Sequence, residues 1–431
     1  MKKLTLTTKT MIALVCGISF GLLLSQIEST FIKQTLLIDG ILKLMGTGFL
    51  NAIKLLVAPL VFVSIVYATA SLKEIKQVGR IGLKTLGFYL LTTGLAVSLA
   101  LVMANIINPG KGIDTSILTT TTETITTTGS VNLIDTLLSM IPTNIFVAFS
   151  EGNVLGIIFF AILLGISMTL VGEKAQPLVH IFEILNDVLL KLVSLIMVFA
   201  PFGIFALLAS NFAAFGFTAL VPLLKYVLGT IFTLGLHLGI VYMGLLVFVG
   251  KLNPIIFLKK FMPIFSICFS TASSSAGLPL SLKTSEEQFG VKPSVCSFTL
   301  PLGTTINMDG TAIMQGFAVV FIAQMYGISL GFNDYIMVII TAILASVGTA
   351  SVPGVGTVML TMVLASVNLP VDAIALLIGI DHIIDMCRTP INVAGDHICT
   401  LIVAKSENAL DESIYNNMEI NKQTTTATQA A

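Results

Sequence analysis

The chain has 431 residues, of which 55% are hydrophobic and only 10% are charged, and its 22 basic and 22 acidic residues cancel to a formal net charge of zero. Its mean hydropathy of +0.99 lies outside the range of soluble domains, so the composition excludes a soluble fold. The sequence lacks the basic stripe with interleaved aromatic residues that is typical of nucleic-acid-binding proteins. We therefore expect a polytopic membrane protein.

Six apolar runs in the first 250 residues predict membrane-spanning helices, since a hydrocarbon core about 30 Å thick requires roughly 20 helical residues. The alternation typical of barrel strands is absent, so the predicted fold is all-α. Several runs are long enough to be tilted or broken. They lie at 10–27, 41–70, 81–107, 135–171, 177–210 and 217–250.

Clusters of basic residues predict the orientation in the membrane. They lie at 2–9, 73–84 and 251–260, all on one side if each run crosses once. By the positive-inside rule that side is cytoplasmic, so both termini of this cell (inner) membrane protein are expected there. The Thr-rich segment 111–134 is then an extracellular loop, and 406–431 is a cytoplasmic tail that is partly disordered.

Two stretches in the last third interrupt their apolar runs with small and turn-forming residues. One contains SSSAGLP and the other has GTASVPGVG at its centre. The arms of the second have about 13 and 11 residues and reach roughly 20 Å and 17 Å, so neither crosses the membrane. We predict re-entrant helical hairpins at 258–290 and 335–369, because non-helical backbone at membrane depth needs protein or a watery cavity beside it. The tripeptide TAS at both tips hints at inverted repeats.

A stripe of polar residues marks the last apolar run. Asp381, Asp385, Arg388, Asn392 and Asp396 are spaced 4, 3, 4 and 4 residues apart, which places them on one face of a helix. An ionisable side chain at the centre of a membrane helix costs about 2.5 to 3.5 kcal/mol, so the stripe must face partners or water. One alternative is a closed salt-bridge network within the protein.

The charges in this region do not balance. Arg388 is the only lysine or arginine between Lys292 and Lys405, whereas Asp309 adds a fourth carboxylate to the three of the stripe. One guanidinium cannot neutralise them all. We therefore expect bound cations or protons to supply positive charge.

The choice of arginine at this depth points to a ligand carboxylate. Only Arg80 and Arg388 are arginines among the 22 basic residues. A guanidinium grips a carboxylate bidentately, which lysine cannot do, so Arg388 is expected to clamp a ligand carboxylate while Asp385 takes an amine. A structural pair between Arg388 and Asp385 is the alternative.

The sequence GTTINMDGT interrupts another apolar run and frees backbone carbonyls beside Asn307 and Asp309. Hard cations prefer oxygen ligands, and a partly unwound helix with a carboxylate is a common sodium site in membranes. A simple helix kink is the alternative. The excess of carboxylates favours the ion site.

Four motifs closely resemble the dicarboxylate/amino acid:cation symporter family, which includes archaeal aspartate transporters, bacterial glutamate carriers and animal excitatory amino-acid transporters. They occur in the family's order, and the similarity covers nearly the whole chain. The motifs are SSSAGLP (273–279), NMDGT (307–311), SVGTASVPGVG (346–356) and DMCRTPINVAGD (385–396).

The resemblance implies eight transmembrane helices and two hairpins with inverted repeats, assembled as a homotrimer with an elevator-type mechanism. Scaffold helices 1–2 and 4–5 would be 1–76 and 135–212, and helix 3 of the transport domain would be 77–110. The transport-domain core, 213–405, would hold helix 6, the two hairpins, helix 7 (about 296–327) and helix 8 (about 372–405).

The resemblance also implies the site. Substrate would be bound by Ser274, Thr311, Val352, Gly356, Asp385, Arg388, Thr389 and Asn392. One sodium would lie at Gly303, Asn307, Asn392 and Asp396, a second near Thr305, Ser346, Val347 and Thr349, and a third at Tyr89, Thr92, Thr93, Asn307 and Asp309.

The expected function is import of glutamate or aspartate coupled to sodium ions, without enzymatic activity or a cofactor. Alternatives are proton coupling or a C4-dicarboxylate substrate; Asp385 favours an amino acid, because C4-dicarboxylate members lack the D-x-x-R-T spacing. An intramembrane aspartyl protease is disfavoured by the missing G-x-G-D stretch, and a channel by the missing charged rings. Ala272 and Met386 replace family arginines, which leaves potassium coupling open, and Pro390 is expected to bend the last helix.

Overall fold

The computed structural model describes residues 6–27, 31–71, 80–111, 141–151, 154–215, 220–348 and 354–417. Within these ranges the secondary structure is helical, apart from one isolated antiparallel bridge between Val291 and Leu410. The prediction of an all-α fold is therefore confirmed. The predicted Thr-rich loop from residue 112 onward and the tail after residue 417 lie outside the described residues.

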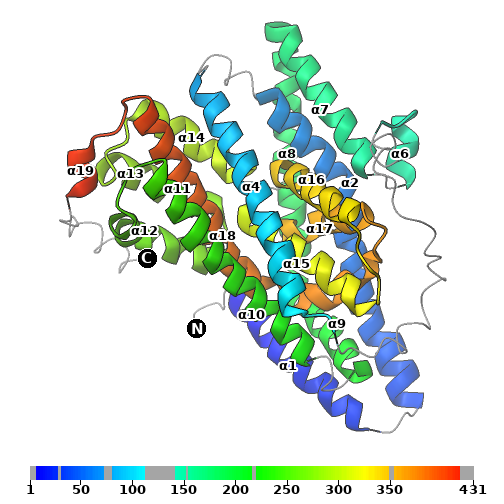
Figure 1. Ribbon diagram of the computed structural model, residues 1–431. Coiled ribbons are helices and arrows are strands. Elements are labelled where there is room, and N and C mark those ends of the chain that lie inside the picture. Colours follow the sequence, from blue (N-terminus) through cyan, green and yellow to red (C-terminus); the bar gives the residue numbers. More distant parts are fainter. Residues whose placement is uncertain are drawn as a thin grey trace, which may run out of the picture.

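Helices from the first half of the chain form a group that packs mainly within itself. α1 lies along α9, and α2 contacts α7, α8 and α9 (Figure 1). The group consists of α1 (Leu6–Gln26), η1 (Ile32–Leu42), α2 (Lys43–Ser71), α6 (Ile145–Glu151), α7 (Val154–Val171), η3 (Gly172–Ala175), α8 (Gln176–Met197) and α9 (Ala200–Phe215).

The apolar run predicted at 177–210 is two helices in the structure, not one. α8 ends at Met197 and α9 begins at Ala200. Pro201, the second residue of α9, explains the position of the break, because a proline has no N–H to continue a preceding helix but fits the first turn of a new one.

The second group surrounds α18, which contacts α12, α14, α15 and α10, while α15 packs along α4 (Figure 1). Its elements are α4 (Arg80–Ile107), α10 (Leu220–Leu236), η5 (His237–Tyr242), α11 (Met243–Phe248), α12 (Pro254–Thr271), α13 (Ser274–Glu287), α14 (Pro293–Ile306), α15 (Asp309–Met325), α16 (Phe332–Gly348), α17 (Val355–Ala365), η6 (Val371–Ala373), α18 (Ile374–Ser406) and α19 (Glu412–Asn416).

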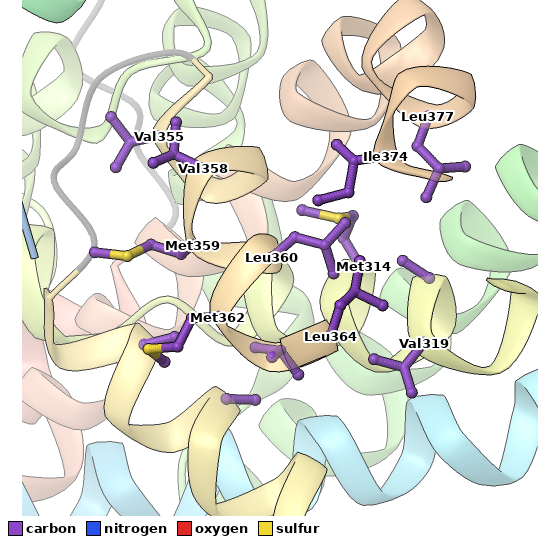
Figure 2. Packing of buried hydrophobic residues seen from close by; sticks show 14 of the residues in the cluster. Met314, Val319, Val355, Val358, Met359, Leu360, Met362, Leu364, Ile374 and Leu377 are labelled. Carbon is purple, nitrogen blue, oxygen red and sulfur yellow. The ribbon is translucent and has the colours of Figure 1, made fainter. Parts of the chain in front are cut away.

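Two helices of this group lie inside the protein on all sides. Every residue of α15 except Gln324 is buried, as is every residue of α17 from Val355 to Leu364. Figure 2 shows apolar side chains of α17, among them Leu360 and Leu364, together with Met314 of α15 and Ile374 of α18. The apolar surface of α17 is thus removed from lipid by neighbouring helices, which lets it hold a polar site at its first turn.

The helices are interrupted where the sequence indicated. Ala272 adopts a left-handed conformation (φ +48°) between α12 and α13, and Ser273 caps α13 by accepting a hydrogen bond from the Ala276 N–H. The second predicted tip, 349–353, lies outside the described residues, and α17 follows Gly354 (φ +85°). α18 is a continuous helix through Pro390.

Six helices of the described ranges are long and apolar enough to cross a membrane. Large apolar side chains are exposed on their outer faces, for example Leu170, Phe232 and Phe248. Water would penalise such surfaces, whereas lipid accommodates them, so the structure is that of a multi-pass membrane protein. The number of eight crossing helices stays a prediction.

The segment after α18 folds back on the ends of several helices. Glu407 pairs with Arg80 (2.5 Å) and Lys84 (2.6 Å) of α4. The Lys260 ammonium donates to the carbonyls of Ile414 (3.0 Å) and Tyr415 (2.8 Å). These contacts connect α4, α12 and the segment that follows α18.

Candidate functional site

The polar stripe of α18 is buried among helices rather than exposed to lipid. Asp381, Asp385, Arg388, Asn392 and Asp396 are each at most 7% exposed. They face the helices that surround α18 in the second group. The expectation that the stripe meets protein or water rather than lipid agrees with this burial.

Arg388 holds two carboxylates at one end of the stripe. Its Nε donates to Asp385 Oδ1 (2.9 Å) and its Nη1 to Asp381 Oδ1 (3.1 Å). The Thr357 hydroxyl donates to the other oxygen of Asp381, and the Gly354 N–H donates to Asp385 Oδ2 (3.2 Å). The pair of Arg388 and Asp385 that the sequence left open is therefore present, and with Asp381 the group carries one excess negative charge.

Glycine at position 356 lets the first turn of α17 approach this arginine. A Cβ on Gly356 would lie 2.7 Å from Arg388 Nη2 and 2.8 Å from the Thr311 methyl group. The Gln315 amide donates to the Gly356 carbonyl (3.3 Å) and so connects α15 to the same turn. Gly356, Thr311, Asp385 and Arg388, all predicted substrate residues, thus converge from three helices.

Side chains from other helices form hydrogen bonds with backbone groups at the break between α14 and α15. Ser346 Oγ donates to the Ile306 carbonyl (2.7 Å), and the Met308 N–H donates back to it (3.1 Å). Asn392 Oδ1 accepts from the Gly310 N–H (2.7 Å), while the partner of Asn392 Nδ2 among the described residues is the Met308 sulfur (3.3 Å). A thioether is a weak acceptor, so this amide N–H group is available to a stronger one such as a carboxylate.

Asp396 lies at the other end of the stripe and has a neutral neighbour. Its Oδ1 accepts a hydrogen bond from Asn307 Nδ2 (2.9 Å), and a Cβ on Gly303 would lie only 2.3 Å from the same oxygen and 2.6 Å from the Tyr89 hydroxyl. Asn307 Oδ1 is buried without a partner among the described residues. An unpartnered amide oxygen beside a buried carboxylate is the chemistry of a hard-cation site.

Asp309 is surrounded by three side chains that face its carboxylate. Its Oδ1 accepts from the Thr93 hydroxyl (2.6 Å), and its Oδ2 accepts from the Tyr242 hydroxyl (2.7 Å). His237 Nε2 lies 3.2 Å from Oδ2. All four side chains are buried.

The remaining predicted residues lie less centrally. Ser274 is buried at the start of α13, Thr92 and Thr389 donate to backbone carbonyls of their own helices (3.2 Å and 2.8 Å), and Thr305 is exposed. Val347 is partly buried near the end of α16. Thr349 and Val352 lie outside the described residues.

Several residues at the site were not predicted as ligands. Asp381 had a sequence signal, since it is in the stripe, and His237 had one too, as a histidine inside an otherwise apolar run. Tyr242, Thr357 and Gln315 had no comparable signal. Gln315 is 1% exposed, and its Oε1 has no partner in the described part of the chain.

Known proteins are similar to this chain over most of its length. Residues 6–406 match the model of the sodium:dicarboxylate symporter family. The chain is 35% identical to the proton/glutamate-aspartate symporter of Escherichia coli over 95% of this chain and 94% of that protein. It is 33% identical to the proton/sodium-glutamate symport protein of Geobacillus stearothermophilus (93% and 96% covered) and 30% identical to the C4-dicarboxylate transport protein of Rhizobium johnstonii (93% and 89%).

Proposed function

Since the chain belongs to the sodium:dicarboxylate symporter family, a family of transporters for acidic amino acids or C4-dicarboxylates, we propose that it imports glutamate or aspartate together with sodium ions. The observation that carries this proposal is the buried cluster of Arg388 with Asp381 and Asp385. It holds groups that complement both the anionic and the cationic parts of an acidic amino acid.

The cluster supports an exchange of partners on binding. A substrate carboxylate takes donors of Arg388, and Asp385, freed from the guanidinium, accepts the substrate ammonium. The Asn392 Nδ2 group, whose partner in the described part of the chain is a sulfur atom, donates to the second carboxylate. A C4-dicarboxylate has no ammonium and would leave Asp385 buried without a counter-charge, which is costly.

Charge balance supports a coupling cation. Arg388, Asp381 and Asp385 sum to one negative charge, and an acidic amino acid adds another. Asp396 and the unpartnered Asn307 Oδ1 offer oxygen ligands for a sodium ion near this charge. Substrate and ion then stabilise each other at short range in a medium of low dielectric constant.

The movement, the assembly and the orientation belong to the same proposal. The two groups of helices pack mostly within themselves, which supports an elevator-type displacement of one against the other. The proposal also includes assembly as a homotrimer in the cell membrane, with both termini of each chain in the cytoplasm. Cross-linking of cysteine pairs between the groups, in inward- and outward-facing conditions, measures the displacement.

Uptake into proteoliposomes tests the function directly. Purified protein is reconstituted, and uptake of labelled aspartate and glutamate is measured under an inward sodium gradient, with competition by a panel of amino acids and by succinate. We expect uptake that requires sodium and is inhibited by acidic amino acids. Equal uptake with choline in place of sodium would remove the sodium coupling.

Proton coupling is the second candidate, because one relative is named a proton/glutamate-aspartate symporter. Buried carboxylates bind protons as an alternative to cations. Uptake that follows a pH gradient and ignores sodium identifies this mechanism, and preference for succinate identifies the C4-dicarboxylate alternative.

A further inference from the structure

The guanidinium of Arg388 presents different edges to its two carboxylates. Nε and Nη2 lie on one edge, and both are 2.9 Å from Asp385 Oδ1. Nη1 lies on the other side of the group, 3.1 Å from Asp381 Oδ1. A carboxylate that binds an arginine bidentately needs two parallel N–H groups, and the edge of Nε and Nη2 provides them. The geometry therefore directs a ligand carboxylate to the edge that Asp385 occupies.

The second oxygens of these two carboxylates are bound by different parts of the chain. Asp385 Oδ2 accepts from the backbone N–H of Gly354 (3.2 Å), which precedes α17 and has a φ of +85°. Asp381 Oδ2 accepts from the hydroxyl of Thr357, a side chain in the first turn of α17. Thr357 and Asp381 are both buried. Because a hydroxyl that donates to a buried carboxylate forms a strong hydrogen bond, Asp381 is held at both of its oxygens.

The hydroxyl of Thr357 also limits what Arg388 must supply. In the described part of the chain, the donors to the Asp381 carboxylate are Arg388 and Thr357. Without the hydroxyl, Asp381 Oδ2 would be a buried acceptor that lacks a donor, which is unfavourable. The guanidinium would then turn toward Asp381 to satisfy both oxygens, and its bidentate edge would leave the position that a ligand carboxylate needs.

We propose that Thr357 is a positioning residue for substrate binding. It fixes Asp381 as the carboxylate that Arg388 keeps, so that Asp385 is the one that a substrate carboxylate displaces. Thr357 acts through Asp381 on the orientation of the guanidinium and touches no substrate itself. The inference rests on the proposed function and identifies a residue that sets the preference of the site for acidic over neutral substrates.

Three variants test this role. Thr357→Val replaces the hydroxyl with a methyl group of similar size, and Thr357→Ser keeps the hydroxyl. Thr361→Val is the matched control, because Thr361 lies one turn further along α17 and its hydroxyl donates to the Val358 carbonyl of the same helix (2.6 Å). Dissociation constants are measured on the purified protein in sodium, with labelled aspartate as the ligand and serine as a competitor. Uptake into proteoliposomes gives KM and kcat for aspartate.

We expect Thr357→Val to weaken aspartate binding about 10-fold and to leave serine binding within about twofold of the native value, since serine has no side-chain carboxylate for Arg388 to bind. The KM for aspartate should rise while kcat changes little. Thr357→Ser and Thr361→Val should both bind aspartate like the native chain.

Two results would overturn the role of Thr357. One is unchanged aspartate binding in Thr357→Val. The other is equal weakening for aspartate and serine, which would show that the hydroxyl only holds α17 against α18. If Thr357→Val does not fold, judged by size-exclusion chromatography, Thr357→Ala takes its place and the same outcomes decide.

Failure of the proposed function gives a different result. A native chain that binds succinate in place of aspartate contradicts the proposed substrate, and the variants are then compared with labelled succinate, whose carboxylate needs the same edge of Arg388. Unchanged succinate binding in Thr357→Val would overturn the role of Thr357 in that case too. A native chain that binds neither ligand overturns the proposed function and this inference with it.

Discussion

The two ends of the polar stripe on α18 handle buried negative charge in opposite ways. At one end Arg388 supplies a fixed positive charge to Asp381 and Asp385. At the other, none of the ion pairs in the described part of the chain includes Asp396, and its hydrogen-bond donor is the neutral Asn307. The first arrangement suits an anion with an ammonium group and the second suits a cation, so under the proposed function one helix would carry the groups for both substrate and ion.

The largest effect is expected where the fixed charge is removed. Arg388→Cys removes the guanidinium that is proposed to bind a substrate carboxylate, and truncating one partner of a buried charge pair in a complex costs about 2 to 5 kcal/mol, so affinity for aspartate should fall at least about 30-fold. Uptake of neutral amino acids should rise relative to uptake of aspartate. Competition assays with serine and aspartate measure the shift, with the exposed Arg80→Cys as control. Unchanged selectivity would show that Arg388 does not bind the substrate side chain.

The next largest effect is expected at the end of the stripe that holds Asp396. Asp396→Asn removes the charged oxygen ligand from the proposed sodium site, and losing a hydrogen-bonding charge costs about 1.5 to 3 kcal/mol, so half-saturation by sodium should rise roughly 10-fold or more. Sodium titration of aspartate uptake gives this number. A half-saturation equal to the native value would show that the coupling ion does not bind at Asp396.

A smaller change at the same end adds only one methyl group. Gly303→Ala would place its Cβ 2.3 Å from Asp396 Oδ1 and 2.6 Å from the Tyr89 hydroxyl, so one of them must move. We expect the sodium concentration for half-saturation to rise, but by less than in Asp396→Asn. Gly235→Ala is the matched control, because its Cβ meets nothing within 4 Å. Identical sodium titrations for the two variants would contradict the tight packing around Asp396.

The smallest effect lies outside the membrane-spanning helices. Hydrogen bonds and charges of Arg80 and Lys84 lower the pKa of Glu407 to about 2. Because this pKa is depressed below its ordinary value of 4.5, the pair stabilises the fold above pH 4.5, and this contribution is lost as pH falls through about 2. Glu407→Gln should lower the thermal midpoint slightly at pH 7, with the difference from the native chain shrinking below pH 4. A difference that is constant with pH would rule out this pair as its cause.

The sequence predicted more about the site than about the path of the helices around it. Asn307 and Asp309 were recognised as a break in a helix, and the break is present at Asn307–Met308. The run 177–210 was predicted as one span, whereas the structure breaks it before Pro201, a position that hydropathy alone does not mark. The pairing of Arg388 with both Asp381 and Asp385 depends on side-chain rotamers, which the spacing of residues in the sequence does not specify.

By itself, the amino-acid sequence determined that the chain is helical, that it lies in a membrane and that α18 carries a charged face. These properties follow from composition and from the 3.6-residue period of a helix, which are local. Only the tertiary structure decided which polar groups meet. His237 reaches Asp309 across 72 positions of sequence and Thr93 reaches it across 216, and such contacts depend on how separate helices pack, which no local pattern records.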